Sequence, residues 1–145
     1  MLPERTLRQF TIGLSLGTIV FGLIPFLFPR FFARLFNIPL EDEPAAVTTV
    51  RAIGARDTIS GVGILSATLH EGRVAPWLLA RALTDGTDAI GIAIAWLAGS
   101  RNLGFTLLGL IAAGATVVDV FLWREHKSAR QRKIPNMTSN PAEAS

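Results

Sequence analysis

The sequence predicts an all-α fold, a bundle of four transmembrane helices in a single membrane domain over residues 1–125. Half of the 145 residues are hydrophobic and the mean hydropathy is +0.42, too apolar for an ordinary soluble domain of this size. The apolar residues form four long blocks of about 20 residues, the length that a helix needs to cross the hydrocarbon core. The spans are expected near residues 10–28, 45–69, 76–98 and 103–123.

The first span is uncharged and contains Gly13, Gly17 and Gly22, whose small size lets another helix approach closely. Pro25 and Pro29 mark its end. A cleavable signal peptide is the rival interpretation of this block, but no clear small-x-small cleavage site follows the apolar run. We therefore expect a membrane span.

A short interfacial helix is expected between the first two spans. Residues 29–36 mix bulky apolar side chains with Arg30 and Arg34, which are four positions apart. This pattern is typical of a helix that lies in the headgroup layer. The acidic residues at 41–43 then close the connection as a solvated loop.

Short polar turns connect the other spans, at residues 70–73 and 99–102. From residue 126 to 145 the chain becomes a basic and then a polar tail, rich in serine, proline and alanine. Such a composition buries too little apolar surface to fold by itself, so the tail is predicted to be disordered.

Lysines and arginines beside the spans predict the orientation, because cytoplasmic loops carry the excess of positive charge. Eight of them gather on the side of the two termini and three on the other side. We therefore expect both termini in the cytoplasm, with the chain in the cell inner membrane or, in a eukaryote, in an internal membrane. The eight are Arg5, Arg8, Arg73, Arg124, Lys127, Arg130, Arg132 and Lys133, and the three are Arg30, Arg34 and Arg101.

Several functional classes find no support in the sequence. Cysteine is absent, and His70 and His126 both lie outside the apolar blocks, so neither a thiolate nor an imidazole metal site is expected. No phosphate-binding glycine loop and no Gly-x-Ser-x-Gly elbow is present. The basic tail fits a membrane surface better than a nucleic acid. We expect no cofactor, and the lipid bilayer as the main partner.

Ionisable residues inside the spans are the main functional signal. A charged side chain that faces lipid near a helix centre costs about 2.5–3.5 kcal/mol or more, so these groups must face each other, water or a ligand. In the third span, Arg81, Asp85 and Asp88 recur at three- and four-residue intervals and share one helix face. That face should point into the bundle. The candidates in the three charged spans are Arg51, Arg56, Asp57, Arg81, Thr84, Asp85, Asp88 and Asp119.

Depth in the membrane suggests a trial pairing of these charges, because a helix rises about 1.5 Å per residue. Arg81 is level with Asp119, Arg56 is level with Asp85, and Asp88 falls between the levels of Arg56 and Arg51. Asp57 is then left without a cation. A buried carboxyl group without a cation binds a proton, as a general acid or a proton carrier requires.

The string from Arg51 to Gly61, with Gly54-Ala55-Arg56-Asp57 at its centre, resembles the Gly-x-Arg-Asp signature of a family of small membrane proteins with four spans. That family, from bacteria and fungi, is a domain of unknown function. The resemblance covers about residues 10–126 and includes the Phe-Asn-Ile-Pro ending at residues 36–39. It implies a fold and a topology but no activity.

Three functions from different classes remain open, and so does the question of whether the chain is an enzyme. The first is a pocket for a lipophilic small molecule, with acid–base isomerisation or cyclisation as candidate reactions. Asp57, Asp85 and Asp88 would be the catalytic acids or bases. The candidate binding residues are Arg51, Arg56, Arg81, Thr84 and Asp119.

The second function is a small proton-coupled transporter, in which the same charges would line a path for protons. Four spans are few for alternating access, so this function needs a homodimer, and the face of Gly13 and Gly17 offers a contact. The third is a structural or assembly subunit of a membrane complex, in which ion pairs only fix the register of the helices.

Overall fold

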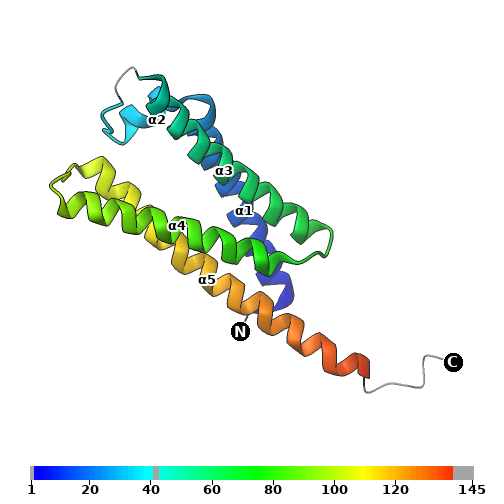
Figure 1. The fold of residues 1–145 in the computed structure, drawn as a ribbon. Coiled ribbons are helices and arrows are strands. Elements are labelled where there is room, and N and C mark those ends of the chain that lie inside the picture. Colours follow the sequence, from blue (N-terminus) through cyan, green and yellow to red (C-terminus); the bar gives the residue numbers. More distant parts are fainter. Residues whose placement is uncertain (1, 41–42, 139–145) are drawn as a thin grey trace.

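The computed structural model describes residues 2–40 and 43–138, and these residues form five helices and no strand (Figure 1). This confirms the predicted all-α fold class. The helices are α1 (Glu4–Leu27), α2 (Pro29–Leu35), α3 (Pro44–Leu69), α4 (Val74–Leu97) and α5 (Leu103–Thr138).

Prolines and tight turns set several helix ends. Pro29 and Pro44 occupy the first turns of α2 and α3, where a missing N–H group costs no intrahelical hydrogen bond. After α3, Glu71 adopts a left-handed φ of 54°. The N–H of Gly72 then donates to the carbonyl oxygen of Ala67 at 2.7 Å. The chain therefore reverses within the short turn that the sequence predicts at residues 70–73.

Two helices, rather than the four that the sequence predicts, are long and apolar enough by themselves to cross a membrane. They are α1 and the part of α5 over Leu103–Arg132. Helices α3 and α4 match the predicted positions, but α3 contains Arg51, Arg56 and Asp57, and α4 has three ionisable residues in adjacent turns. Each of these helices thus contains three ionisable residues, which sets α3 and α4 apart from the apolar spans of α1 and α5. The short predicted helix after the first span is present as α2.

Helix α5 is longer than the sequence predicts, because residues 126–138 continue it where a disordered tail is expected. Arginine, lysine, glutamine and alanine, which are frequent here, all favour a helix. The segment also contacts α1, because the ring Nε2 of His126 lies 2.9 Å from Oγ1 of Thr11. Just before the segment, Glu125 accepts a hydrogen bond from the backbone N–H of Leu2, which precedes α1. Residues 139–145 of the predicted tail lie outside the described residues.

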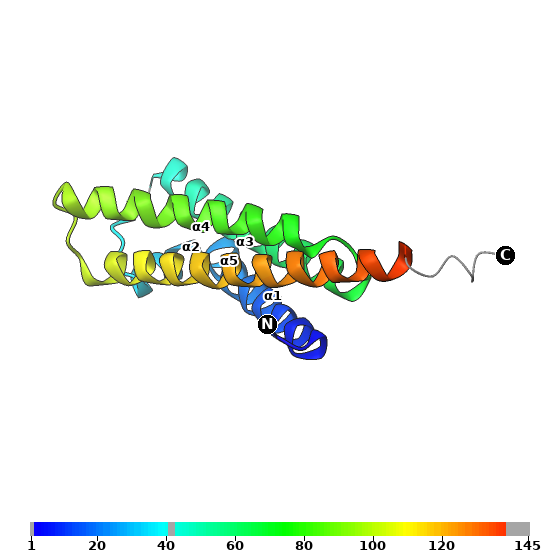
Figure 2. The ribbon, with the colours of Figure 1, turned by 90° about the horizontal axis from the view of Figure 1, so that it is seen from below.

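The long helices form two antiparallel pairs. Helix α1 packs along α3, and α4 packs along α5, whereas the contacts between the pairs are much fewer. In Figures 1 and 2, α4 and α5 run side by side over the full length of α4. In Figure 1 the α1/α3 pair diverges from them towards α2 and the α4–α5 turn.

Glycine allows α1 and α3 to approach each other closely. A Cβ atom on Gly22 would lie 2.6 Å from the backbone nitrogen of Thr58 and 2.7 Å from the carbonyl oxygen of Gly54. Gly54 in turn faces the backbone of Gly22 and Phe26. The backbones therefore touch directly, as small residues permit in membrane helix pairs.

An apolar plug joins the two pairs near the α3–α4 turn. All four long helices contribute to it, and its side chains are at most 7% exposed. Five side chains form the apolar plug: Leu7, Ile64, Val74, Leu78 and Leu122.

The distribution of polarity differs from that of a soluble protein. Thr11, Ser15 and Asp119 are fully buried, whereas Leu103 and Leu97 are 76% and 73% exposed. Large exposed apolar side chains occur on every helix. Such an extensive apolar surface is unusual for a soluble monomer.

The contact at Gly22 gives a test of the packing. We expect Gly22→Ala to lower the free energy of unfolding by about 1–3 kcal/mol, because the added methyl group overpacks the α1/α3 contact. Gly17→Ala is the matched control, since a Cβ there meets nothing within 4 Å and alanine favours a helix. Unfolding in mixed detergent–SDS micelles measures both. Equal losses in the two variants would contradict the packing.

Candidate functional site

Arg56 connects the two helix pairs through ionic contacts. From α3, its Nη2 donates to Oδ2 of Asp88 on α4 at 2.7 Å, and its Nη1 lies 3.4 Å from Oδ1. Its Nε also donates to Oδ1 of the adjacent Asp57 at 3.1 Å. One guanidinium group thus contacts two carboxyl groups and holds α4 beside α3, in the fork geometry that arginine favours.

Arg81 makes a second and more deeply buried contact, within the α4/α5 pair. Its Nη1 donates to Oδ1 of Asp119 at 3.0 Å. Its Nη2 lies 3.4 Å from Oδ2 of Asp85, one turn further along α4. The side chains of Arg81 and Asp85 are each 10% exposed, and that of Asp119 is fully buried. Burial of this kind makes each interaction strong and each missing partner costly.

The cluster contains more acids than bases. Four carboxyl groups surround two guanidinium groups. Three buried atoms have no hydrogen-bond partner among the described residues: Arg81 Nε, Asp85 Oδ2 and Asp119 Oδ2. Because nearly all buried polar atoms are paired in folded proteins, this deficit is a specific feature of the site. Within the described part of the chain, no histidine, cysteine and acidic side chains are grouped to hold a metal ion.

These charges line one wall of a cavity of about 430 Å³ between the two helix pairs. Asp57, Arg81, Asp85 and Asp88 supply the charged wall, and aromatic and aliphatic side chains supply most of the remainder. A few converging polar groups in an apolar cavity are typical of a site for a small molecule. The apolar lining includes Phe21, Phe32, Ile38, Val50, Ile53, Ile92, Phe105, Leu108 and Ile111.

The end of the cavity near α2 is bridged by a contact between two turns. Asn102, before α5, donates from Nδ2 to the carbonyl oxygen of Asn37, after α2, at 2.8 Å. A Cβ atom on Gly104 would overlap the carbonyl oxygen of Phe36. The cavity is therefore bounded by this contact at one end and by the apolar plug at the other.

Most of the candidate residues predicted from the sequence belong to the ionic cluster, but two do not. Asp57, Arg81, Asp85 and Asp88 line the cavity, Asp119 lies buried behind Arg81, and Arg56 holds Asp57 and Asp88. Two others are not part of the cluster. Arg51 is exposed and forms no ion pair with a described residue, and the hydroxyl of Thr84 donates to the carbonyl oxygen of Arg81.

The trial pairing is correct for one arginine and wrong for another. Arg81 pairs with Asp119 as its depth predicts. Arg56 pairs with Asp57 and Asp88 rather than with Asp85, so Asp57 is not the carboxyl group without a cation. Three residues of a helix rise only about 4.5 Å, which a flexible arginine side chain easily spans. Depth alone therefore does not choose between neighbouring turns.

Sequence reasoning missed the aromatic wall of the cavity. Phe21, Phe32 and Phe105 come from three different helices, and nothing in their local sequence separates them from phenylalanines that face outwards, such as Phe10. Phe21 and Phe32 make an edge-to-face contact with ring centroids 5.9 Å apart. Only the tertiary packing of α2 against α1 reveals this wall.

Comparison with known proteins gives a family but no activity. A family model described as "Domain of unknown function (DUF4267)" matches residues 15–140. The matched range contains the whole ionic cluster, all of α2 to α5 and the part of α1 from residue 15 onwards. No curated protein and no solved structure matches the chain.

The buried pair gives a second test. We expect Asp119→Asn to lower the free energy of unfolding by about 3–5 kcal/mol, because Arg81 then keeps a buried charge with only a 3.4 Å contact to Asp85. Asp88→Asn is the comparison, since Asp88 is 37% exposed and Arg56 retains Asp57. Its loss should be about 1 kcal/mol or less. SDS titration in mixed micelles measures the free energy of unfolding of both variants. A larger loss of stability in Asp88→Asn than in Asp119→Asn would contradict the assigned burial.

Proposed function

The chain belongs to the DUF4267 family, and from this premise we propose that it is an integral membrane protein whose ionic cavity binds a lipophilic small molecule. The observation that carries the proposal is the contrast within the cavity, which is lined both by apolar, partly aromatic side chains and by carboxyl and guanidinium groups. A lipophilic molecule with one polar group fits such a contrast. The polar group would lie against Asp57, Asp85 and Asp88.

The outer surface supports a membrane location. Two helices are long and apolar enough to span a bilayer, and large apolar side chains are exposed on all the helices. We propose that α3 and α4 also span, because their charges, except that of the exposed Arg51 in the second turn of α3, turn towards the cavity and towards each other. The excess of basic residues beside both termini supports a cytoplasmic location for the termini in this proposal.

The excess of acids suggests what the site does chemically. If all four carboxyl groups were ionised, two positive charges would face four negative ones in an apolar surrounding. Proton binding by two of the acids removes this imbalance. Asp85 is the foremost proton donor or acceptor, because it lines the cavity and its Oδ2 has no hydrogen-bond partner among the described residues. Acid–base isomerisation or cyclisation of the bound molecule is the corresponding reaction class.

A small proton-coupled transporter is the second candidate function. A second cavity, at the end of the bundle near the α3–α4 turn, lies across the apolar plug from the ionic cavity. Alternating access requires one site that opens to each side of the membrane in turn, and here the apolar plug would be the barrier between the ionic cavity and the side of the second cavity. A Cβ atom added at Gly13 or Gly17 would meet no atom within 4 Å. This face of α1 could therefore contact a second copy of the chain. In this function the plug would open, and pH-driven flux across reconstituted vesicles would reveal it.

The main proposal predicts a ligand that depends on the carboxyl groups. We expect a lipophilic compound to co-purify with the wild-type protein and to be lost from the Asp57→Asn, Asp85→Asn double variant, because both carboxyl groups line the cavity. Untargeted mass spectrometry of the purified proteins and of their membranes measures this. A compound that accumulates in the variant membranes would identify a substrate rather than a passive ligand.

The control for this experiment is the Leu83→Ala, Ile90→Ala double variant. Both residues lie on α4, are 64% and 63% exposed, and do not line the cavity. This variant should keep the compound. If wild type and the carboxyl variant give the same profile while both fold, the pocket function fails and the charges serve only to hold the helices together.

A further inference from the structure

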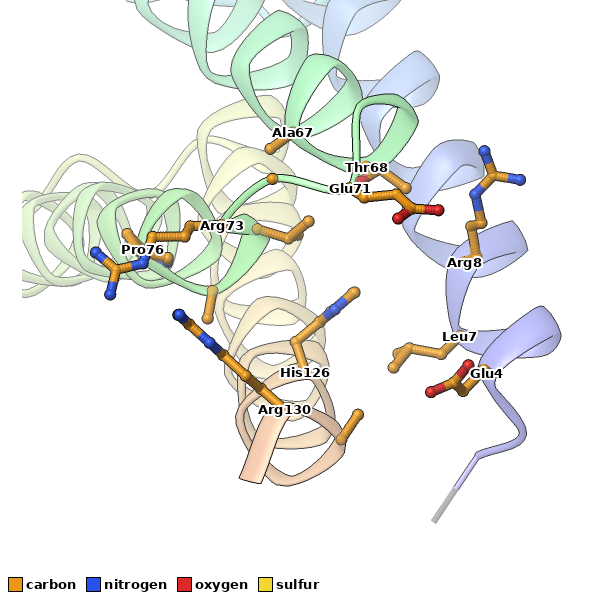
Figure 3. A pocket seen from close by; sticks show the side chains of 14 residues that line it. Glu4, Leu7, Arg8, Ala67, Thr68, Glu71, Arg73, Pro76, His126 and Arg130 are labelled. Carbon is orange, nitrogen blue, oxygen red and sulfur yellow. The ribbon is translucent and has the colours of Figure 1, made fainter. Parts of the chain in front are cut away.

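The second cavity, of about 530 Å³, lies at the basic end of the bundle. We use "basic end" for the end where the start of α1, the α3–α4 turn and the second half of α5 meet. Figure 3 shows the side chains around this cavity. Its inner part is apolar: Leu7 and Val74 both line it and both belong to the apolar plug. Its charged residues come from the surrounding helix ends and turn.

Three arginines and two glutamates supply these charges. Arg8 belongs to α1, Arg73 to the α3–α4 turn and Arg130 to α5. In Figure 3, Arg73 and Arg130 extend to one side of the opening, while Glu4, Arg8 and Glu71 lie on the side of α1. Arg73 and Arg130 are exposed, and neither forms an ion pair with a described residue. Two guanidinium groups without an ion pair to a described residue therefore flank an apolar recess, and the two glutamates of the cavity lie on the side of α1.

Aromatic residues place this cavity at the level of a membrane interface. Trp77 follows the cavity residue Pro76 and packs on Gly63. Trp123 precedes His126 by one helical turn, and Nζ of Lys127 lies 5.3 Å from the centre of its ring. Tryptophan and lysine at helix ends are typical of the boundary between headgroups and acyl chains.

We propose that this cavity binds a phosphate group, held by Arg73 and Arg130, and that the phosphate is that of an anionic phospholipid. The guanidinium groups bind the phosphate oxygens, and the apolar recess at Leu7 and Val74 takes the start of an acyl chain. All the basic residues of this cavity other than His126 are arginines, whose planar forks match phosphate oxygens better than a lysine does. Basic pockets between membrane helices on the cytoplasmic side bind lipid headgroups in the same manner.

This site rests on the proposed membrane location, but it is independent of what the ionic cavity binds. It shares no lining residue with the ionic cavity, and the apolar plug lies between them. An enzyme, a transporter and a structural subunit would each be compatible with a lipid that stabilises this end of the bundle.

The experiment compares lipids bound to the full chain. The purified protein is equilibrated with equal amounts of phosphatidylglycerol and phosphatidylcholine in neutral detergent, and native mass spectrometry counts each bound lipid. We expect wild type to prefer phosphatidylglycerol, and the Arg73→Gln, Arg130→Gln double variant to lose about tenfold of that preference, because charge-assisted hydrogen bonds are removed. Arg73→Lys with Arg130→Lys should lose less, since the charges remain while the fork geometry is lost.

The matched control is the Arg5→Gln, Arg132→Gln double variant. It removes the same charge from the same end, at exposed residues that do not line the cavity. We expect its preference to stay within about twofold of wild type, because long-range attraction of a lipid to single exposed charges is weak. Equal losses in both glutamine variants would overturn the proposal and show diffuse attraction to a basic surface.

A second arm distinguishes the source of the phosphate. Inorganic phosphate is added to the lipid-free protein, and the melting temperature is recorded. No shift is expected, because free phosphate gains nothing from the apolar recess. A shift that Arg73→Gln with Arg130→Gln abolishes, together with no preference for phosphatidylglycerol, would support the phosphate site and overturn the lipid as its source.

Discussion

The ionic contacts of Arg56 and Arg81 are the constraint on which the rest of the structure depends. Arg81 ties α4 to α5 through Asp119, and Arg56 ties α3 to α4 through Asp88. Arg56 therefore supplies the ionic part of the connection between the helix pairs, in addition to the apolar plug. Removing Asp119 would leave the charge of Arg81 buried without its main partner, and this cost favours the observed arrangement of α4 and α5.

The cavity follows from the way the pairs are joined. They meet at the apolar plug near the α3–α4 turn and at the contact of Asn102 with Asn37 at the other end. Between these two places the contact of Arg56 with Asp88 joins the pairs. A bundle with leucine at these positions would close, whereas the arginine–aspartate contacts keep one wall polar and leave space beside it.

The sequence predicts the helices well because their boundaries have local causes. Long apolar runs, Pro29, Pro44 and the polar turn at residues 70–73 mark them without any tertiary information. The extended α5 is the exception, since contacts with α1 at Thr11 help to order residues that by composition predict a tail. The number of spans cannot be predicted from one helix at a time, because the charges of α3 and α4 are compatible with a membrane span only when they are paired with other charges inside the bundle.

The site is predicted only in part, and for a geometric reason. Helix periodicity correctly groups Arg81, Asp85 and Asp88 on the face that turns inwards. Periodicity gives the face within one helix, and residue rise gives the depth, but neither gives the rotation of one helix relative to the next. That rotation decides that Arg51 is exposed, that Arg56 reaches Asp88, and which phenylalanines line the cavity.

The two cavities have opposite charge, and this asymmetry constrains any function. The ionic cavity has an excess of carboxyl groups, the cavity at the basic end has an excess of arginines, and the apolar plug lies between them. A cation or proton is therefore favoured at one end and an anion at the other, and crossing the plug costs desolvation for either. While Ile64 and Leu78 stay fully buried, the cavities act as separate sites. Exchange between them requires the helix pairs to move at the plug, where they are most tightly packed.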